Sequence, residues 1–368
     1  MGESISEELV LKTLRTVQDP DLHRDIVSLG FVKNLEIKNG LVKFNIELTT
    51  PACPVKDRLK EECESKIRQL PGVSNVQVTL TAQVRGRSGF EQAAVLPGVR
   101  NIIAIASGKG GVGKSTVAAN LALAMAKTGA KVGLLDCDIY GPSVPLMFGL
   151  TGQQPQVTAD QKIVPLEAHG IRLMSIGFLA GEKTPVIWRG PMVHQILQQF
   201  LTRVQWGELD YLVLDLPPGT GDAQLTLTQS APLSGAVIVT TPQEVSLIDA
   251  RKGLQMFQKV NVPVLGLIEN MSYFACPDCG KVVEIFRRGG GEKMSQELNV
   301  PLLGEIPIDP EIVRTGDQGI PIVAAQPDSQ TAKVYQIIAG AIAAQMSIAN
   351  MKSGLTEPVD IKWEARKS

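Results

Sequence analysis

A glycine-rich run with two lysines constrains the fold of this chain more than any other stretch: Gly108-Lys109-Gly110-Gly111-Val112-Gly113-Lys114-Ser115-Thr116. It lies between an apolar run at 102–106, which predicts a buried strand, and a helix predicted over 117–126. Strand, glycine-rich turn and helix form a phosphate-binding P-loop, in which backbone N–H groups surround phosphate oxygens at a helix N-terminus. We therefore expect Lys114 to reach the β- and γ-phosphates of a nucleotide and the Ser115 hydroxyl to bind magnesium.

Composition places the chain among ordinary globular proteins. Its 368 residues are enough for two domains, with 44% hydrophobic and 20% charged residues. The formal net charge of −1 provides no bulk positive charge, so we expect no nucleic-acid partner. We expect no membrane partner either, because the longest apolar run, 337–344, is shorter than the roughly 18 residues that cross a bilayer. Five cysteines after an acidic N-terminus predict a cytoplasmic protein with reduced thiols.

The pattern of apolar residues changes near residue 100, which predicts two domains. Residues 1–82 predict a small α+β domain in the order helix, two strands, helix, strand, with a hairpin turn at Asn39-Gly40. Residues 83–99 are polar and predict a linker. Over 100–350 apolar strands alternate with helices, which predicts a doubly wound, mostly parallel sheet in an α/β P-loop NTPase domain. Residues 351–368 predict a loose C-terminal tail.

Two acidic segments follow predicted strands of the larger domain. Asp136 and Asp138 leave the strand at 132–135, and Asp215 ends the strand at 211–214, just before a Pro-Pro-Gly turn at 217–219. Ligands of open α/β sheets bind at the carboxyl ends of the strands. An aspartate at such an end is placed to reach magnesium or the attacking water. We therefore expect Asp215 to be directed at magnesium.

The P-loop with its additional lysine, together with both acidic segments, resembles the deviant Walker A group of NTPases, which includes MinD, ParA, ArsA and NifH. The resemblance implies ATP hydrolysis. In that group the additional lysine reaches the partner's nucleotide, so Lys109 implies an ATP-dependent homodimer, and a cation in that place stabilises charge on the transferring phosphoryl group. The resemblance further implies catalytic roles for Lys109, Lys114 and Asp138, the last by orienting the hydrolytic water. It also implies that Asp215 holds magnesium and that Asn270 contacts adenine.

The segment Cys276-Pro277-Asp278-Cys279 has the spacing of a metal-binding pair. Zinc or an iron–sulfur cluster normally takes four ligands, and the chain has no second pair with this spacing. Two copies of the chain would bring four thiolates together on a two-fold axis, and Lys109 requires the same face-to-face dimer. We favour a bridging iron–sulfur cluster, and a structural zinc site or a thiol redox pair remain the alternatives.

With this cysteine pair the resemblance narrows to the Mrp family, ApbC-like ATPases that carry iron–sulfur clusters, over residues 100–345. The matching stretches are 268–272, 289–291 and 306–310. Residues 1–82 resemble the small iron–sulfur assembly domain of SufT and PaaD proteins, through 19–20, 25–30 and 48–54. The resemblance implies a carrier of a labile [4Fe-4S] cluster, with apoproteins as recipients and cluster-assembly proteins as partners.

Other functions are compatible with the same nucleotide site. A positioning ATPase of the MinD or ParA kind would bind a membrane or DNA, and a NifH-like electron donor would hold a stable, reducible cluster. A scaffold held together by zinc is a third alternative. The predicted C-terminal helix, 334–349, has no basic face and so disfavours the first. Cys53 fits either cluster handling or simple burial, whereas we expect Cys63 and Cys137 to be structural.

Overall fold

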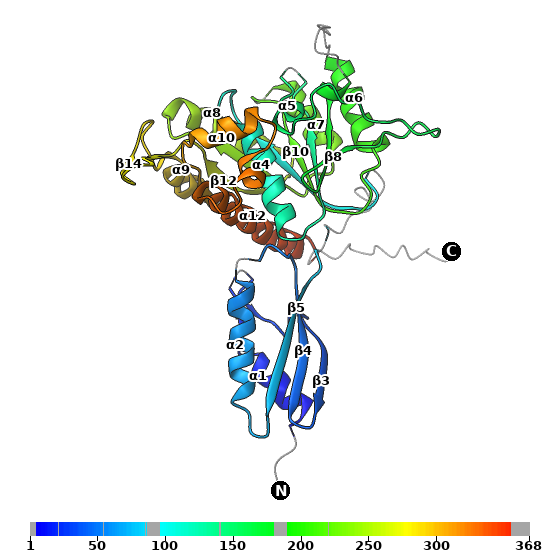
Figure 1. Ribbon diagram of the computed structural model, residues 1–368, viewed down its shortest axis with the longest axis vertical. Helices are drawn as coiled ribbons and strands as arrows, with labels where there is room; N and C mark the ends of the chain where they lie inside the picture. The colour runs from blue at the N-terminus through cyan, green and yellow to red at the C-terminus, as the bar shows by residue number, and fades with distance from the viewer. Residues whose placement is uncertain are drawn as a thin grey trace, which may run out of the picture.

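The chain has two main sheets (Figure 1), a small one of three strands and a large one of eight. The computed structural model describes residues 5–20, 22–53, 55–84, 86, 96–139, 141–179, 190–219 and 221–354. A hydrophobic core of its own accompanies each sheet: one cluster spans Val10 to Val78 and the other spans Ala52 to Met346.

The N-terminal part forms a three-stranded sheet in the order β3-β4-β5, with β3 antiparallel and β5 parallel to β4. Its elements follow the predicted order, with a short ribbon, β1 and β2, in addition: α1 (Glu7–Leu14), β1 (Gln18–Asp19), β2 (Arg24–Asp25), β3 (Val32–Lys38), β4 (Leu41–Leu48), α2 (Lys56–Arg68) and β5 (Asn75–Ala82).

Local sequence signals explain the ends of these elements. The Ser6 hydroxyl caps α1 by accepting a hydrogen bond from the Leu9 amide. Asn39 and Gly40 have φ of 49° and 80°, the left-handed conformation that a tight hairpin requires between β3 and β4. Helix α2 begins at Lys56 and carries Asp57 in its first turn and Lys66 and Arg68 in its last, where these charges are favourable.

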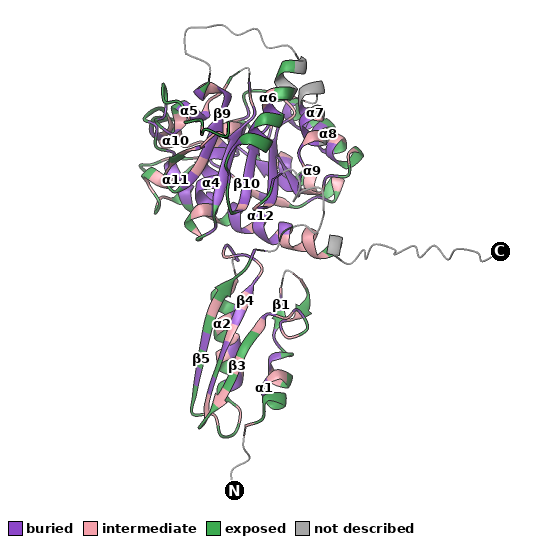
Figure 2. Cartoon of the chain, turned by 90° about the vertical axis from the view of Figure 1, so that its right-hand side faces the viewer, coloured by how far each residue is buried: buried purple, intermediate pink, exposed green. Residues whose placement is uncertain are grey.

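The second sheet has the order β15-β12-β11-β6-β10-β7-β9-β8, and all its neighbouring strands are parallel except β8 and β9. Its strands are β6 (Val99–Ala106), β7 (Val132–Asp136), β8 (Leu166–Ala168), β9 (Ile171–Ser175), β10 (Leu209–Asp215), β11 (Gly235–Thr240), β12 (Val264–Glu269) and β15 (Leu302–Glu305). A short antiparallel hairpin, β13 (Phe274–Ala275) and β14 (Val282–Val283), follows β12. Figure 2 shows the central strands buried between the helices.

The helices of this part are α4 (Lys114–Lys127), α5 (Val144–Met147), α6 (Gly190–Arg203), α7 (Asp222–Ser230), α8 (Glu244–Lys259), α9 (Gly290–Leu298), α10 (Pro310–Asp317), α11 (Ile322–Ala325) and α12 (Gln330–Gly354). A 3-10 turn, η1, covers Ile176–Phe178. From β6 the chain crosses through α4 to β7, toward the β8 edge of the sheet. From β10 it crosses through α7 to β11, toward the β15 edge. Since such crossovers are right-handed, these two helices cover opposite faces of the sheet. The doubly wound α/β fold is confirmed, and its switch point lies at β6, whose carboxyl end carries the P-loop.

Helix α12 is longer than predicted. Residues 330–352 are long and apolar enough to cross a membrane by length and composition alone, although the sequence showed no continuous apolar run of that length. Buried residues along the helix, including Tyr335, Ile338 and Ile342, join the core of the larger sheet, and the helix packs against α4 and β15. We therefore interpret α12 as a core helix. It continues to Gly354, past residue 350, where the tail was expected to begin.

The end of the small sheet contacts the larger sheet at the start of β10. The Tyr211 hydroxyl is 3.1 Å from the Thr50 hydroxyl, and both side chains are buried. Arg100 donates to the Val84 carbonyl and pairs with Asp210 at 3.2 Å. Parallel strands place the starts of β6 and β10 at the edge opposite the P-loop, so this contact is remote from the predicted nucleotide site.

Candidate functional site

The carboxyl edge of the large sheet brings the predicted nucleotide-site segments together. The P-loop follows β6, Asp138 follows β7, Asp215 ends β10, and Asn270 follows β12. These four strands lie near one another in the sheet, which is why segments more than 150 residues apart in sequence converge.

Backbone conformation explains the glycines of the P-loop. Gly111 and Gly113 have φ of 81° and 79°, a region that L side chains rarely adopt. At Gly108 an added Cβ would collide with the backbone of Asp249 in α8, so this position also requires close packing. Gly110 faces open space. The Lys109 carbonyl accepts from the Ser107 hydroxyl at 2.9 Å, which closes the start of the loop.

The first residue of α4, Lys114, is almost fully buried. Its Nζ donates to Asp215 Oδ1 at 2.5 Å and to Ser115 Oγ at 3.1 Å. Phosphate oxygens would compete with the carboxylate for the same ammonium group. Thr116 follows in the first turn, where its carbonyl accepts from the Asn120 side chain.

Burial raises the pKa of two neighbouring carboxyl groups. The pKa of Asp215 is raised by burial, against the opposing effect of Lys114. Burial, together with the charge of Asp215, raises the pKa of Asp136 to about 7. Asp215 Oδ2 is buried with no hydrogen-bond partner in the described part of the chain. A buried carboxylate oxygen beside a serine hydroxyl is the oxygen chemistry that magnesium prefers, so Ser115 and Asp215 fit this ion.

Asp138 is held in place by the aspartate before it. Its amide donates to Asp136 Oδ1 at 3.0 Å, while Asp136 Oδ2 accepts from Ser175 Oγ at 2.9 Å and from the Val144 amide at 3.3 Å. Asp136 therefore ties the loop after β7 to β9 and to α5. The half-buried Asp138 and Lys109 lie at the same edge of the sheet.

Asn270 binds the P-loop itself. Its Nδ2 donates to the Val112 carbonyl at 2.8 Å, and the residue is buried. An added Cβ at Gly113 would collide with the same Nδ2, which is a second reason for glycine there. Contact between Asn270 and adenine stays a prediction.

The cysteine pair lies on the hairpin between β13 and β14. The Cys276 amide donates to the Lys281 carbonyl at 3.0 Å, and the Gly280 amide donates to the Cys276 carbonyl at 2.8 Å. The Cys276 sulfur accepts hydrogen bonds from the Cys279 amide, which has the largest effect on its pKa, from the Asp278 amide and from the Cys279 thiol. These donors lower the pKa of Cys276 and favour the thiolate, which is the form that ligates metal. Cys276 is half-buried and Cys279 is exposed.

The other three cysteines are buried. Burial and the nearby Glu62 raise the pKa of Cys63 to about 12, and burial raises the pKa of Cys137 well above its ordinary value. The expectation that both are structural is consistent with these inert environments. Cys53 packs in the core of the small sheet. In the described part of the chain, no three His, Cys, Asp or Glu residues gather into a metal site.

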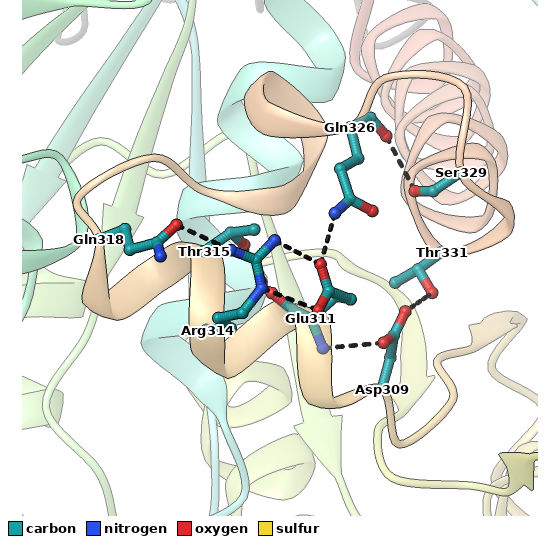
Figure 3. Close-up of polar contacts among 8 residues, drawn as sticks. All are labelled: Asp309, Glu311, Arg314, Thr315, Gln318, Gln326, Ser329 and Thr331. Carbon is teal, nitrogen blue, oxygen red and sulfur yellow. Dashed lines mark hydrogen bonds and ion pairs between the residues drawn. The ribbon is translucent and has the colours of Figure 1, made fainter. Parts of the chain in front are cut away.

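The stretch 306–310 leads into a polar network around α10 (Figure 3). Asp309 caps the helix by accepting from the Glu311 amide at 2.9 Å, and it accepts from Thr331 Oγ1 of α12 at 2.5 Å. Glu311 pairs with Arg314 and accepts from Gln326. These contacts join α10, α11 and α12.

Two functional candidates escaped the sequence analysis. Glu269 is a fully buried acid at the end of β12, and Arg288 closes the cysteine hairpin on Glu305. Glu269 lies within the stretch 268–272 singled out above, and Arg288 directly precedes the stretch 289–291. The signal that could have found Glu269 is an acid at the end of an apolar strand, the same pattern as Asp215.

Comparison with known proteins decides the family. Residues 98–343 match the family described as the NUBPL iron-transfer P-loop NTPase, of the ParA group, and residues 7–80 match the iron–sulfur cluster assembly protein family. The chain belongs to the iron-transfer P-loop NTPases. The resemblance drawn from the P-loop and the cysteine pair is thereby confirmed.

Relatives of this NTPase agree with that assignment. An iron–sulfur cluster carrier protein from Synechocystis sp. is 52% identical over 349 residues, which are 94% of this chain and 99% of the relative. Among solved structures, a nucleotide-binding protein from Archaeoglobus fulgidus in complex with ADP is 42% identical with a TM-score of 0.55, covering 62% of this chain and 89% of that one. The cell division ATPase MinD from Pyrococcus furiosus is 25% identical with a TM-score of 0.50, covering 66% and 98%.

Proposed function

We propose that this chain is a cytoplasmic ATPase that carries a labile [4Fe-4S] cluster between two copies of itself and transfers it to apoproteins. The observation that carries the proposal is the pair of sulfur atoms on the β13–β14 hairpin. Backbone amides lower the pKa of Cys276, which favours its thiolate form, and Cys279 is exposed three residues along the chain. The family and its relatives supply the class of cargo.

One copy provides only half of the ligands that a cluster needs. The pair supplies two thiolates, and the described residues contain no group of three metal-ligating side chains to complete the set. A second copy related by a two-fold axis would supply the other two. A cluster shared in this way is labile, since a modest separation of the copies removes two of its four ligands.

Apolar side chains next to the cysteines support such a dimer. Val282, Val283, Ile285 and Phe286 are all exposed on or just after β14. Contiguous exposed apolar residues of this kind mark interaction surfaces. Burial against the same hairpin of a second copy would remove them from water and exclude water from the sulfur atoms.

At the nucleotide site we assign the roles expected from the sequence. Residues 108–116 would hold ATP, with Lys114 on its phosphates, and Ser115 and Asp215 would hold magnesium. Asp138 would orient the attacking water. Lys109 would reach the nucleotide of the partner copy, where a cation stabilises charge on the transferring phosphoryl group.

Cluster transfer itself needs no electron donor. Four thiolates of the recipient replace the four cysteine sulfurs of the dimer on iron, so the cluster keeps its oxidation state. Protons leave the recipient thiols as they bind and return to the released cysteines. We assign contact with cluster-assembly proteins or recipients to the N-terminal assembly domain, in line with its family match.

Anaerobic reconstitution with iron and sulfide tests the cluster site. We expect visible absorbance corresponding to about one cluster per two chains, and its complete loss in the Cys276→Ala/Cys279→Ala variant. The Cys63→Ala/Cys137→Ala variant is the matched control and should keep the absorbance. Absorbance that survives the first double substitution, or zinc in place of iron in freshly purified protein, contradicts the proposal.

Replacement of Lys109 tests the dimer. We expect Lys109→Ala to reduce ATP turnover by about 100-fold or more, because a cation on the transferring phosphoryl group typically contributes 10³–10⁵. Mixing Lys109→Ala with Asp138→Ala chains should restore part of the activity, since each mixed dimer holds one complete site. Full activity of Lys109→Ala alone would remove the argument for a shared site.

A further inference from the structure

A five-residue segment, from Glu269 at the end of β12 to Tyr273, contacts the P-loop and leads into the cysteine hairpin. At its second residue, Asn270 Nδ2 binds the Val112 carbonyl of the P-loop at 2.8 Å. Cys276 follows only six residues later along the chain. The Met271 side chain also lies close to Gly113, and Met271 has φ of 57°, a conformation uncommon for a residue other than glycine.

The Asn270 contact orients a backbone N–H group that can donate a hydrogen bond to a phosphate. The peptide between Val112 and Gly113 is trans and planar, so its carbonyl and its N–H point in opposite directions. A hydrogen bond that holds the Val112 carbonyl therefore sets the direction of the Gly113 N–H. P-loop amides of this kind bind nucleotide phosphates. Phosphate binding at Gly113 must then bear on Asn270.

The first residue of the segment fastens both ends of the cysteine hairpin. Glu269 is fully buried, and its Oε1 accepts from Ser272 Oγ at 2.5 Å and from the Gly289 amide at 3.2 Å. Its Oε2 accepts from the Gly291 amide at 2.5 Å, at the N-terminus of α9, where a negative charge is favoured. Because Ser272 precedes Cys276 and Gly289 follows Cys279, one carboxylate binds the chain on both sides of the hairpin.

A second clamp lies one residue closer to the hairpin at each end. Arg288 donates from Nε and Nη2 to Glu305 Oε2 at 3.0 and 2.6 Å, and its guanidinium lies 4.7 Å from the centre of the Tyr273 ring. Tyr273 and Arg288 flank the hairpin on either side, so the hairpin joins the sheet as one unit through these contacts.

We propose that Asn270 and Glu269 are positioning residues that transmit occupancy of the P-loop to Cys276 and Cys279, through a hairpin base that the Arg288 clamp holds to the sheet. The proposal rests on the proposed function in taking the cysteine pair as the cargo site. Phosphate binding shifts the Val112–Gly113 peptide, Asn270 follows it, and Glu269 converts that shift into a rotation of the hairpin base. Such coupling is reciprocal, so a metal on the cysteines changes nucleotide affinity by the same factor as nucleotide changes metal affinity.

Alkylation of the two hairpin cysteines measures the transmission. The full chain is treated with iodoacetamide, with and without a saturating non-hydrolysable ATP analogue and magnesium, and the peptide containing both residues is quantified by mass spectrometry. The buried Cys63 and Cys137 serve as internal references. We expect the analogue to change the alkylation rate by about fivefold or more.

Two substitutions interrupt the link without touching the P-loop. Ser272→Ala removes one hydrogen bond between Glu269 and the chain that leads into the hairpin, and Arg288→Ala removes the second clamp. In both variants, the alkylation rates with and without saturating analogue should differ by less than about twofold. We call this quotient the rate ratio. Arg287→Ala is the matched control, with the same loss of charge one residue away, and should keep the ratio of the unsubstituted chain. Because Arg288 is partly exposed, Arg288→Ala carries the test if Ser272→Ala fails to fold.

The proposal is overturned by an unsubstituted chain whose rate does not respond to the analogue, or by an Arg288→Ala chain with an undiminished ratio. Light scattering on the same samples measures the fraction of dimer, because a second copy could protect the cysteines simply by covering them. The proposal is also overturned if, in every variant, the change in alkylation rate follows the fraction of dimer. Reconstitution distinguishes this failure from failure of the proposed function. A chain that binds a cluster without any rate response disproves the transmission alone, and one that responds without binding a cluster disproves the cargo.

Discussion

At the scale of single residues, two buried carboxyl groups lie beside one ammonium group at the carboxyl edge of the large sheet. Lys114 is shared between Asp215 and Ser115, and a second carboxyl, Asp136, lies beside Asp215 on the neighbouring strand. Two buried carboxyl groups and one ammonium favour protonation of one acid. Nucleotide and magnesium would change this balance, because phosphates would bind the ammonium and the metal would bind the carboxylate.

The raised pKa of Asp136 makes stability depend on pH in the absence of nucleotide. Between its ordinary 3.8 and its folded value of about 7, the folded chain binds a proton that the unfolded chain does not. Stability should therefore fall as pH rises from 4 to 7, by up to about 4 kcal/mol from this group. Asp136→Asn should flatten that dependence in urea denaturation without nucleotide or magnesium. Asp160→Asn, at an exposed site, is the control, and identical profiles for Asp136→Asn and the unsubstituted chain would contradict the assignment.

At the scale of elements, capping and close packing set where helices begin and end. Ser6 caps α1 by accepting from an amide three residues further along the chain, whereas Asp309 caps α10 and in addition binds Thr331 on α12 (Figure 3). The first contact is local and readable from four residues of sequence. The second joins residues 22 positions apart, and only the packing of α12 against the sheet brings them together.

Loss of the Asp309 cap should destabilise the larger part of the chain. Asp309→Ala removes the acceptor for the Glu311 amide and for the Thr331 hydroxyl, so we expect the free energy of unfolding to fall by about 1–2 kcal/mol. Tryptophan fluorescence during urea unfolding measures the change. Asp317→Ala, in the last turn of the same helix, should have little effect or a slight stabilising one. Equal losses in the two variants would show that the cap contributes nothing specific.

At the scale of the whole molecule, the two sheets meet at a region remote from the nucleotide edge, through polar contacts and through Ala52, which joins the larger core. Tyr211 reaches Thr50, and Arg100 joins Val84 to Asp210. Cys53 of the N-terminal domain lies three residues beyond Thr50, so this contact places Cys53 near the base of the large sheet. The cysteine hairpin follows β12, which starts at that base and ends at the nucleotide edge.

A double-mutant cycle measures how strongly the two parts are coupled. Tyr211→Phe and Thr50→Val each remove one side of the hydrogen bond, and we expect a coupling free energy of about 1 kcal/mol. Tryptophan fluorescence follows the larger part alone, because residues 1–99 contain no Trp, whereas circular dichroism follows both parts. Additive single effects would show that the hydroxyl pair does not link the two parts.

The sequence by itself determined the P-loop, the strands that alternate with helices, the small α+β module and the cysteine pair. Each depends on local rules: glycine where φ is positive, apolar periods of 2 and 3.6, and turn residues between them. The tertiary structure decided the strand order, the short strands β8, β9 and β15, and the contacts of Asn270 and Glu269. Those depend on which strands become neighbours, and hydrogen bonds between residues far apart in sequence leave no periodic signal. The P-loop was therefore legible in nine consecutive residues, while the link from it to the cysteines emerged only when β12 was placed two strands away from β6.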